Sequence, residues 1–137
     1  MELNIVYKTR KQIICRKMLK KYINKILNTL FKKTDNLELS FVFVDNKYIS
    51  KLNKKFLNKN KPTDVLCFKY DNFSADIIIS IEEVFKNAKI FKTSPKWELL
   101  FVLIHGLLHF KGMEDNTEQK RIKMYNIAYK ILDNFKI

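Results

Sequence analysis

Two histidines lie one helical turn apart in the last third of the chain, and they are its only histidines. His105 and His109 stand inside an apolar run, so a helix there would project both imidazoles from one face. Gly112 can end that helix, which would turn the carboxylate of Glu114 or Asp115 back toward the imidazoles. Two imidazoles and one carboxylate, with a free position for water, form the ligand set of a hydrolytic zinc site. The spacing therefore predicts a metal-dependent hydrolase.

Each of these residues also has a simpler explanation. A single histidine on an apolar helix is commonly a core residue bonded to a carbonyl group, but two buried imidazoles would compete for few acceptors unless a cation holds them. The carboxylates after Gly112 would equally suit a solvated loop. Gly106 costs about 1 kcal/mol relative to alanine inside a helix, which indicates a close approach of another segment. Gly106 also stands where the zinc-protease pattern has its glutamate base, so a peptidase is a weaker alternative.

The composition is that of a globular protein, with 137 residues of which 47% are hydrophobic and 30% charged. We expect a single domain over residues 1–137. The most apolar window, Leu99 to Phe110, is about half as long as a bilayer crossing requires, so no membrane partner is expected. The first residues do not resemble a secretory signal, and Cys15 and Cys67 are too few for a disulfide framework. A cytoplasmic location is the simplest setting.

The positive charge is concentrated in the first half of the chain. Residues 1–61 contain 16 basic and 4 acidic side chains, whereas residues 62–137 contain 11 and 10. Almost all the basic residues are lysines that would also suit a solvated helix surface. The asymmetry as a whole favours an electropositive face that attracts a polyanion such as RNA.

Hydrophobic periodicity predicts a mixed arrangement of strands and helices. We expect strands over 3–7, 37–44, 64–70 and 76–81, the last two as a hairpin, and helices over 11–33, 47–57, 81–91, 95–111 and 117–135. The helix over 95–111 is apolar nearly all round, which is typical of a buried central helix. Inward-facing stripes are expected in the first helix and the last one, namely Ile14, Met18, Tyr22, Ile26 and Leu30, and Ile122, Tyr125, Tyr129 and Leu132. The predicted class is α+β, a mixed four-stranded sheet with helices packed on its faces and a buried central helix carrying the metal ligands.

Three segments resemble the motifs of one known family, the YbeY-type endoribonucleases that mature bacterial rRNA. Residues 105–115, His-Gly-Leu-Leu-His-Phe-Lys-Gly-Met-Glu-Asp, are similar to the family signature His-Gly-x-Leu-His-x-x-Gly-Tyr-Asp-His. Residues 61–68, Lys-Pro-Thr-Asp-Val-Leu-Cys-Phe, resemble Lys-Pro-Thr-Asp-Val-Leu-Ser-Phe. Residues 75–80, Ala-Asp-Ile-Ile-Ile-Ser, resemble Gly-Asp-Ile-x-Ile-Ser. The order and spacing of the three motifs extend the resemblance over most of the chain.

The resemblance implies one Zn²⁺ ion held by His105, His109 and Asp115, and catalysis through the water on that ion. Asp115 stands where the family has a third zinc-binding histidine, and Glu114 is the rival ligand. A carboxylate oxygen binds zinc at about 2.0–2.2 Å, close to the imidazole distance, so the exchange is chemically sound. Leu57 stands where the family has an arginine. Substrate contacts would then fall to three lysines, Lys55, Lys59 and Lys61, although lysine lacks the bidentate geometry of arginine.

These observations predict a zinc-dependent endoribonuclease (a hydrolase) that cleaves single-stranded RNA in the cytoplasm. The resemblance implies a role in rRNA processing at the 3′ end of small-subunit rRNA and in ribosome quality control. Its expected partners are single-stranded RNA, rRNA, the small ribosomal subunit and associated proteins. The alternative is a catalytically weak or silent relative that binds ribosomes or RNA, which Leu57 and Asp115 favour.

Overall fold

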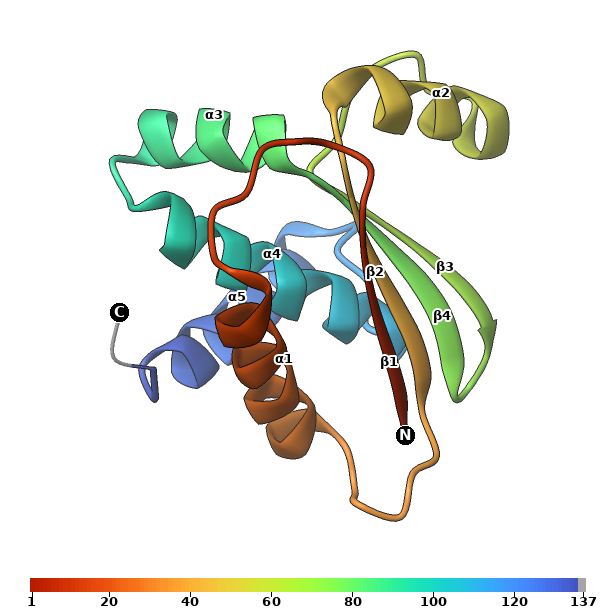
Figure 1. The fold of residues 1–137 in the computed structure, drawn as a ribbon, viewed down its shortest axis with the longest axis vertical. Coiled ribbons are helices and arrows are strands. Elements are labelled where there is room, and N and C mark those ends of the chain that lie inside the picture. The colour runs from red at the N-terminus through yellow and green to blue at the C-terminus, as the bar shows by residue number, and fades with distance from the viewer. Residues whose placement is uncertain (136–137) are drawn as a thin grey trace.

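The computed structural model describes residues 1–135 and contains a four-stranded sheet and five helices (Figure 1). The elements, in chain order, are β1 Glu2–Tyr7, α1 Arg16–Leu30, β2 Glu38–Val44, α2 Asn46–Leu57, β3 Val65–Asp71, β4 Ser74–Ser80, α3 Ile81–Phe91, α4 Pro95–Phe110 and α5 Glu118–Leu132. This order confirms the predicted α+β class. No helix within residues 1–135 combines the length and hydropathy that crossing a bilayer demands.

The sheet is mixed, with strand order β1-β2-β4-β3. β1 pairs with β2 and β2 pairs with β4 in parallel, and each of these strands is separated from the next by helical chain, as parallel neighbours require. β3 and β4 form the predicted antiparallel hairpin, with a register shift between Lys69 and Asp71. β3 is therefore an edge strand, and the loop that leads into it lies beside the helices.

The two faces of the sheet carry different hydrophobic clusters because successive side chains point to opposite sides. Ile77 and Ile79 of β4 belong to the main core with α1, α4 and α5, whereas Ile78 packs with Ile49 of α2 on the other side. The main core lies on the α4 side and holds most of the buried side chains. Helices thus pack on both faces, as predicted.

α4 is the central helix of the fold and contacts α1, α3, α5, β3 and β4 (Figure 1). Ser94 caps its N-terminus by accepting a hydrogen bond from the Trp97 amide, and Pro95 occupies the first turn. Gly106 is the point of closest approach to the sheet. A β-carbon there would lie 3.0 Å from methyl groups of both Ile77 and Val65. The close approach expected at Gly106 is therefore confirmed.

Two amphipathic helices face the core with stripes that match the predicted ones only in part. α1 begins at Arg16, not at Lys11. It buries Ile26, as predicted, together with Leu19 and Ile23, while the predicted Met18 is exposed. α5 buries a stripe of four side chains, Met124, Ala128, Ile131 and Leu132, and leaves Ile122 and Tyr129 exposed. In both helices adjacent stripes are apolar, so the periodicity alone did not decide which stripe packs inward.

Candidate metal centre

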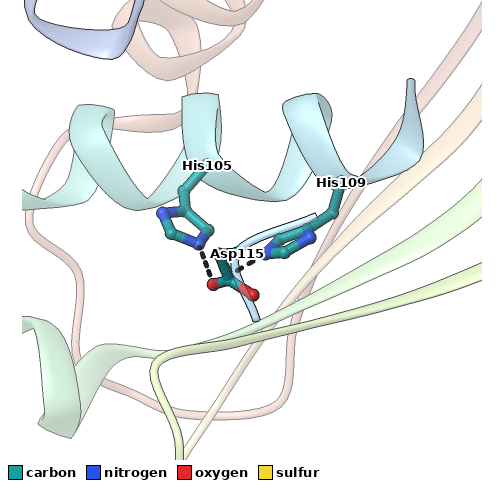
Figure 2. Close-up of side chains that lie close together, drawn as sticks. All are labelled: His105, His109 and Asp115. Atoms are coloured by element: carbon teal, nitrogen blue, oxygen red, sulfur yellow. Dashed lines mark hydrogen bonds and ion pairs between the residues drawn. The ribbon is translucent and has the colours of Figure 1, made fainter. Parts of the chain in front are cut away.

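His105 and His109 lie on the last two turns of α4 with their imidazoles on one side of the helix (Figure 2). The ring centroids are 4.7 Å apart. The His105 side chain is 14% exposed and the His109 side chain 29%, so both can be reached from solvent. The helix therefore presents two accessible imidazoles side by side, as their spacing predicted.

Gly112 ends α4 and reverses the chain. Its φ of 98° lies in the left-handed region, which glycine adopts without strain. The Gly112 amide donates to the His109 carbonyl and the Met113 amide to the Leu108 carbonyl, at 2.9 and 3.0 Å. This pair of hydrogen bonds is the Schellman arrangement, which commonly closes a helix at glycine. The predicted role of Gly112 in turning the chain is confirmed.

The turn brings the Asp115 carboxylate between the two imidazoles (Figure 2). Its Oδ2 atom lies 3.2 Å from Nε2 of His105 and 3.4 Å from Nε2 of His109. One donor atom from each residue lies within 4.8 Å of the other two. Ligands in a tetrahedral zinc site stand about 3.3 Å from one another, and the two distances from Asp115 to the imidazoles match this spacing. His105, His109 and Asp115 are called the candidate metal centre below.

Glu114, the rival carboxylate, is engaged elsewhere. Its carboxylate pairs with the Lys120 ammonium at 2.9 Å, and this contact holds the pKa of Glu114 below its usual value. Its side chain is 64% exposed. The structure therefore brings Asp115, and not Glu114, to the imidazoles.

Neighbouring groups prepare both imidazoles to bind a cation. Nδ1 of His109 lies 3.1 Å from the Met113 carbonyl, which can only accept, so Nδ1 carries the proton and Nε2 keeps its lone pair. Burial, followed by the nearby His109, lowers the pKa of His105, although Asp64 and Asp115 oppose the shift. A lowered pKa favours the neutral imidazole, the form that binds metal.

Asp64 belongs to the surroundings of this centre, although the sequence analysis gave it no chemical role. Its charge acts on His105 and on Tyr125, whose ring lies 5.9 Å from the His105 ring. Burial, then the charges of Asp115 and Asp64, raise the pKa of Tyr125 and keep its phenol protonated. The sequence pattern did not indicate this, because Asp64 comes near α4 only through the packing of its neighbour Val65 against Gly106, which places the start of β3 beside α4.

The predicted substrate lysines lie on or near the end of α2. Lys55, Lys59 and Lys61 are exposed, and none forms an ion pair with another residue of the range 1–135. The loop that carries Lys61 is tied to α2, since the buried Asn53 amide donates to the Lys61 carbonyl at 2.9 Å. Leu57 is the last residue of α2 and is 51% exposed. No contact joins these lysines to the imidazoles, so their part in substrate binding stays a prediction.

The fold and the centre together define an α+β protein with a His-His-Asp cluster at the end of its central helix. A sequence model of the family described as Endoribonuclease YbeY matches residues 4–136. The chain belongs to this family. It is 35% identical to the Endoribonuclease YbeY of Petrotoga mobilis over 131 residues, covering 93% of this chain and 90% of the relative. It is 41% identical to that of Borreliella afzelii over 108 residues, covering 70% of each chain.

A solved structure has the same fold. The solution structure of TM1509 from Thermotoga maritima superposes with a TM-score of 0.64 at 25% identity, covering 96% of this chain and 89% of that chain. The resemblance of the three sequence motifs to the YbeY family is thereby confirmed.

Proposed function

We propose that this chain is a zinc-dependent, single-strand-specific endoribonuclease that acts in rRNA maturation. The observation that carries the proposal is the spacing of three donor atoms, 3.2 and 3.4 Å from the Asp115 oxygen to the two imidazoles, in a chain of an endoribonuclease family. We further propose that the domain spans residues 1–137 and works in the cytoplasm. Its substrate there would be the 3′ end of small-subunit rRNA, with roles in ribosome biogenesis and quality control.

His105, His109 and Asp115 would hold the ion. Three protein ligands leave one position of a tetrahedral site open, which distinguishes catalytic from structural zinc sites. When bound, zinc supplies activation of water near neutral pH and stabilisation of the charge that develops on a phosphodiester. We propose zinc as the ion because two imidazoles with one carboxylate are a known ligand set of catalytic zinc sites.

The remaining residues would orient the ligands and handle protons. The hydrogen bond from Nδ1 of His109 to the Met113 carbonyl holds the His109 ring in one orientation, with its Nε2 atom facing the candidate metal centre. The negative charge of Asp64, in the loop before β3, acts on His105 and would add to the attraction of the centre for a cation. The Tyr125 phenol keeps its proton and can donate a hydrogen bond to a phosphate oxygen.

RNA would approach over the basic first half of the chain. Residues 1–61 contain 16 basic side chains against 4 acidic ones, which attracts a polyanion and makes binding sensitive to salt. Lys55, Lys59 and Lys61 would contact phosphates near the hairpin. The small ribosomal subunit and its associated proteins are the partners we propose on the basis of family membership.

The experiment that tests this proposal measures zinc content and RNA cleavage on the same purified chain. We expect about one zinc per chain, cleavage of an end-labelled single-stranded RNA, and much slower cleavage of a duplex of the same sequence. A chelator should abolish the activity and added zinc restore it. His105→Ala should lose both zinc and cleavage but stay folded, whereas the exposed control Glu114→Gln should keep both. Full cleavage by His105→Ala would contradict a catalytic metal centre.

A catalytically weak or silent RNA-binding relative is the alternative. The exposed Leu57 favours it because an aliphatic side chain cannot bind a phosphate. Stoichiometric zinc and tight RNA binding without cleavage would support this alternative over the endoribonuclease.

A further inference from the structure

A cavity lined by aromatic side chains lies beside the candidate metal centre. It is a cavity of about 360 Å³ between the end of α3, the start of α4 and the middle of α5. Its lining consists of five aromatic side chains and two polar ones, namely Phe91, Trp97, Phe101, Tyr125, Tyr129, Thr93 and Glu98. These residues define the aromatic cavity. Its volume is within the range of small-molecule sites.

The aromatic rings present flat faces. Trp97 and Phe101 stack with centroids 5.3 Å apart and planes 9° from parallel, and Phe101 stacks on Tyr129 at 5.6 Å and 27°. Tyr129 is 44% exposed although it lies in this aromatic group. An exposed ring at the edge of a stack leaves room for one more flat group.

The aromatic cavity lies next to the candidate metal centre. Phe101 and Tyr125 line the cavity, and their rings lie 6.1 and 5.9 Å from the ring of His105. Trp97, Phe101, His105 and His109 recur at every fourth position of α4, so they form a single stripe along the helix. The cavity is therefore the neighbour of the metal centre along this stripe, within reach of a second unit of a chain molecule bound there.

Glu98 places a carboxyl group among these rings. It is only 4% exposed, and its Oε1 atom accepts a hydrogen bond from the Thr93 hydroxyl at 2.7 Å. Thr93 is its one hydrogen-bond partner among the side chains of residues 1–135. Burial raises the pKa of Glu98. In a largely apolar site a few placed polar groups fix the orientation of the ligand, and the Glu98 carboxyl group is in such a position.

The chemistry of the cavity fits a base and opposes a phosphate. Aromatic faces stack on any nucleobase, whereas the Glu98 carboxyl group in the lining of the cavity does not favour a phosphate there. A carboxylate accepts hydrogen bonds from an exocyclic amino group such as that of cytosine. We propose that the aromatic cavity binds one nucleobase of the RNA strand, and that Glu98 selects a base with an exocyclic amino group. This inference rests on the proposed function only in taking RNA as the ligand.

Trp97 provides a direct test because it is the only tryptophan of the chain. Its fluorescence is titrated with CMP and with UMP, which differ at position 4 of one ring, and with ribose 5-phosphate, which has no base. We expect saturable quenching by CMP, weaker binding of UMP by about fivefold or more, and none by the sugar phosphate. The proposal would be overturned if neither CMP nor UMP quenched the fluorescence in a saturable manner, or if ribose 5-phosphate and CMP had equal effects.

Two variants separate stacking from base selection. Tyr129→Leu should weaken CMP binding by about fivefold, whereas Phe73→Leu, which removes a similarly exposed ring from the β3–β4 turn, should leave it unchanged. Glu98→Gln keeps the shape but adds an amide donor, so the preference for CMP over UMP should fall toward one. CMP binding by Tyr129→Leu that equals wild type, or a CMP preference that persists in Glu98→Gln, would overturn the proposal.

The readout separates this inference from the proposed function. Quenching needs neither zinc nor cleavage, so base binding without RNase activity would leave the inference standing while the enzyme assignment fails. Cleavage of RNA without any quenching would overturn the base-binding inference and leave the proposed function standing.

Discussion

Replacing Asp115 by asparagine should weaken zinc binding about a hundredfold. The substitution keeps the size of the side chain but removes the charged oxygen that lies 3.2 and 3.4 Å from the two imidazoles. Loss of a residue that merely supports a zinc ligand typically costs 10- to 100-fold in affinity, and Asp115 is placed to bind the ion directly, so we take the upper end. A hundredfold corresponds to about 2.7 kcal/mol.

Thermal unfolding measures this loss as a zinc-dependent shift of Tm. A free zinc concentration a thousand times the wild-type Kd stabilises the folded state by about 4.1 kcal/mol, and a hundredfold weaker site keeps about 1.4 kcal/mol. For 137 residues, 1 kcal/mol moves Tm by about 4 °C. Zinc should therefore raise the Tm of wild type by about 16 °C and that of Asp115→Asn by about 6 °C. In chelator the two proteins should unfold at similar temperatures because the Asp115 side chain is 39% exposed.

Glu114→Gln is the matched control, since it makes the same kind of change one residue away. Its carboxylate pairs with Lys120, so the zinc shift should equal that of wild type. Asp115→His restores the imidazole of the family signature and should keep a large shift. A full zinc shift in Asp115→Asn combined with its loss in Glu114→Gln would refute the assignment of Asp115 as the third ligand.

Three further predictions test the packing and the departures from the family pattern. Gly106→Ala should lower the free energy of unfolding in urea by about 1 kcal/mol, because overpacking against two methyl groups at 3.0 Å outweighs the gain in helix propensity. A variant more stable than wild type would contradict this packing. Burial raises the pKa of Cys67 to about 11, so at pH 8 about one Cys67 thiol in a thousand is ionised. Cys15→Ser, which keeps only Cys67, should therefore react slowly with a disulfide reagent, and its rate should rise about tenfold per pH unit. Cys67→Ser should react quickly through the exposed Cys15. Equal rates would show that Cys67 is not shielded. Leu57→Arg should raise kcat/KM for single-stranded RNA roughly tenfold, because an arginine adds a charge-assisted phosphate contact at a half-exposed site; an unchanged value would mean that a lysine already fills that role.

The metal centre was predictable because local geometry alone builds it. His105 and His109 are fixed relative to each other by one helical turn, and the glycine turn returns the chain to them within ten residues. The same holds for the order of the elements, whose capping residues and periodicities are local signals. The choice between Glu114 and Asp115 needed coordinates, because both side chains follow the same turn and only one faces the imidazoles.

The features that the sequence analysis missed depend on contacts between distant segments. Asp64 reaches the surroundings of His105 because Val65 packs against Gly106, a contact between residues 41 positions apart. Tyr129 was expected in the core because its stripe is apolar, yet α5 packs through Met124 and Ala128 and turns Tyr129 toward the aromatic cavity. No periodicity distinguishes a ring that fills a core from one that lines a cavity.

Gly106 connects these observations. Because it has no side chain, α4 approaches Ile77 of β4 and Val65 of β3 closely enough for the loop before β3 to meet the helix. This approach places Asp64, the residue before Val65, where its charge acts on His105. The imidazoles are spaced by one turn of a buried helix, so their separation is set by the most rigid part of the fold. A larger residue at Gly106 would therefore alter the distance between Asp64 and the imidazoles while leaving the imidazoles themselves correctly spaced.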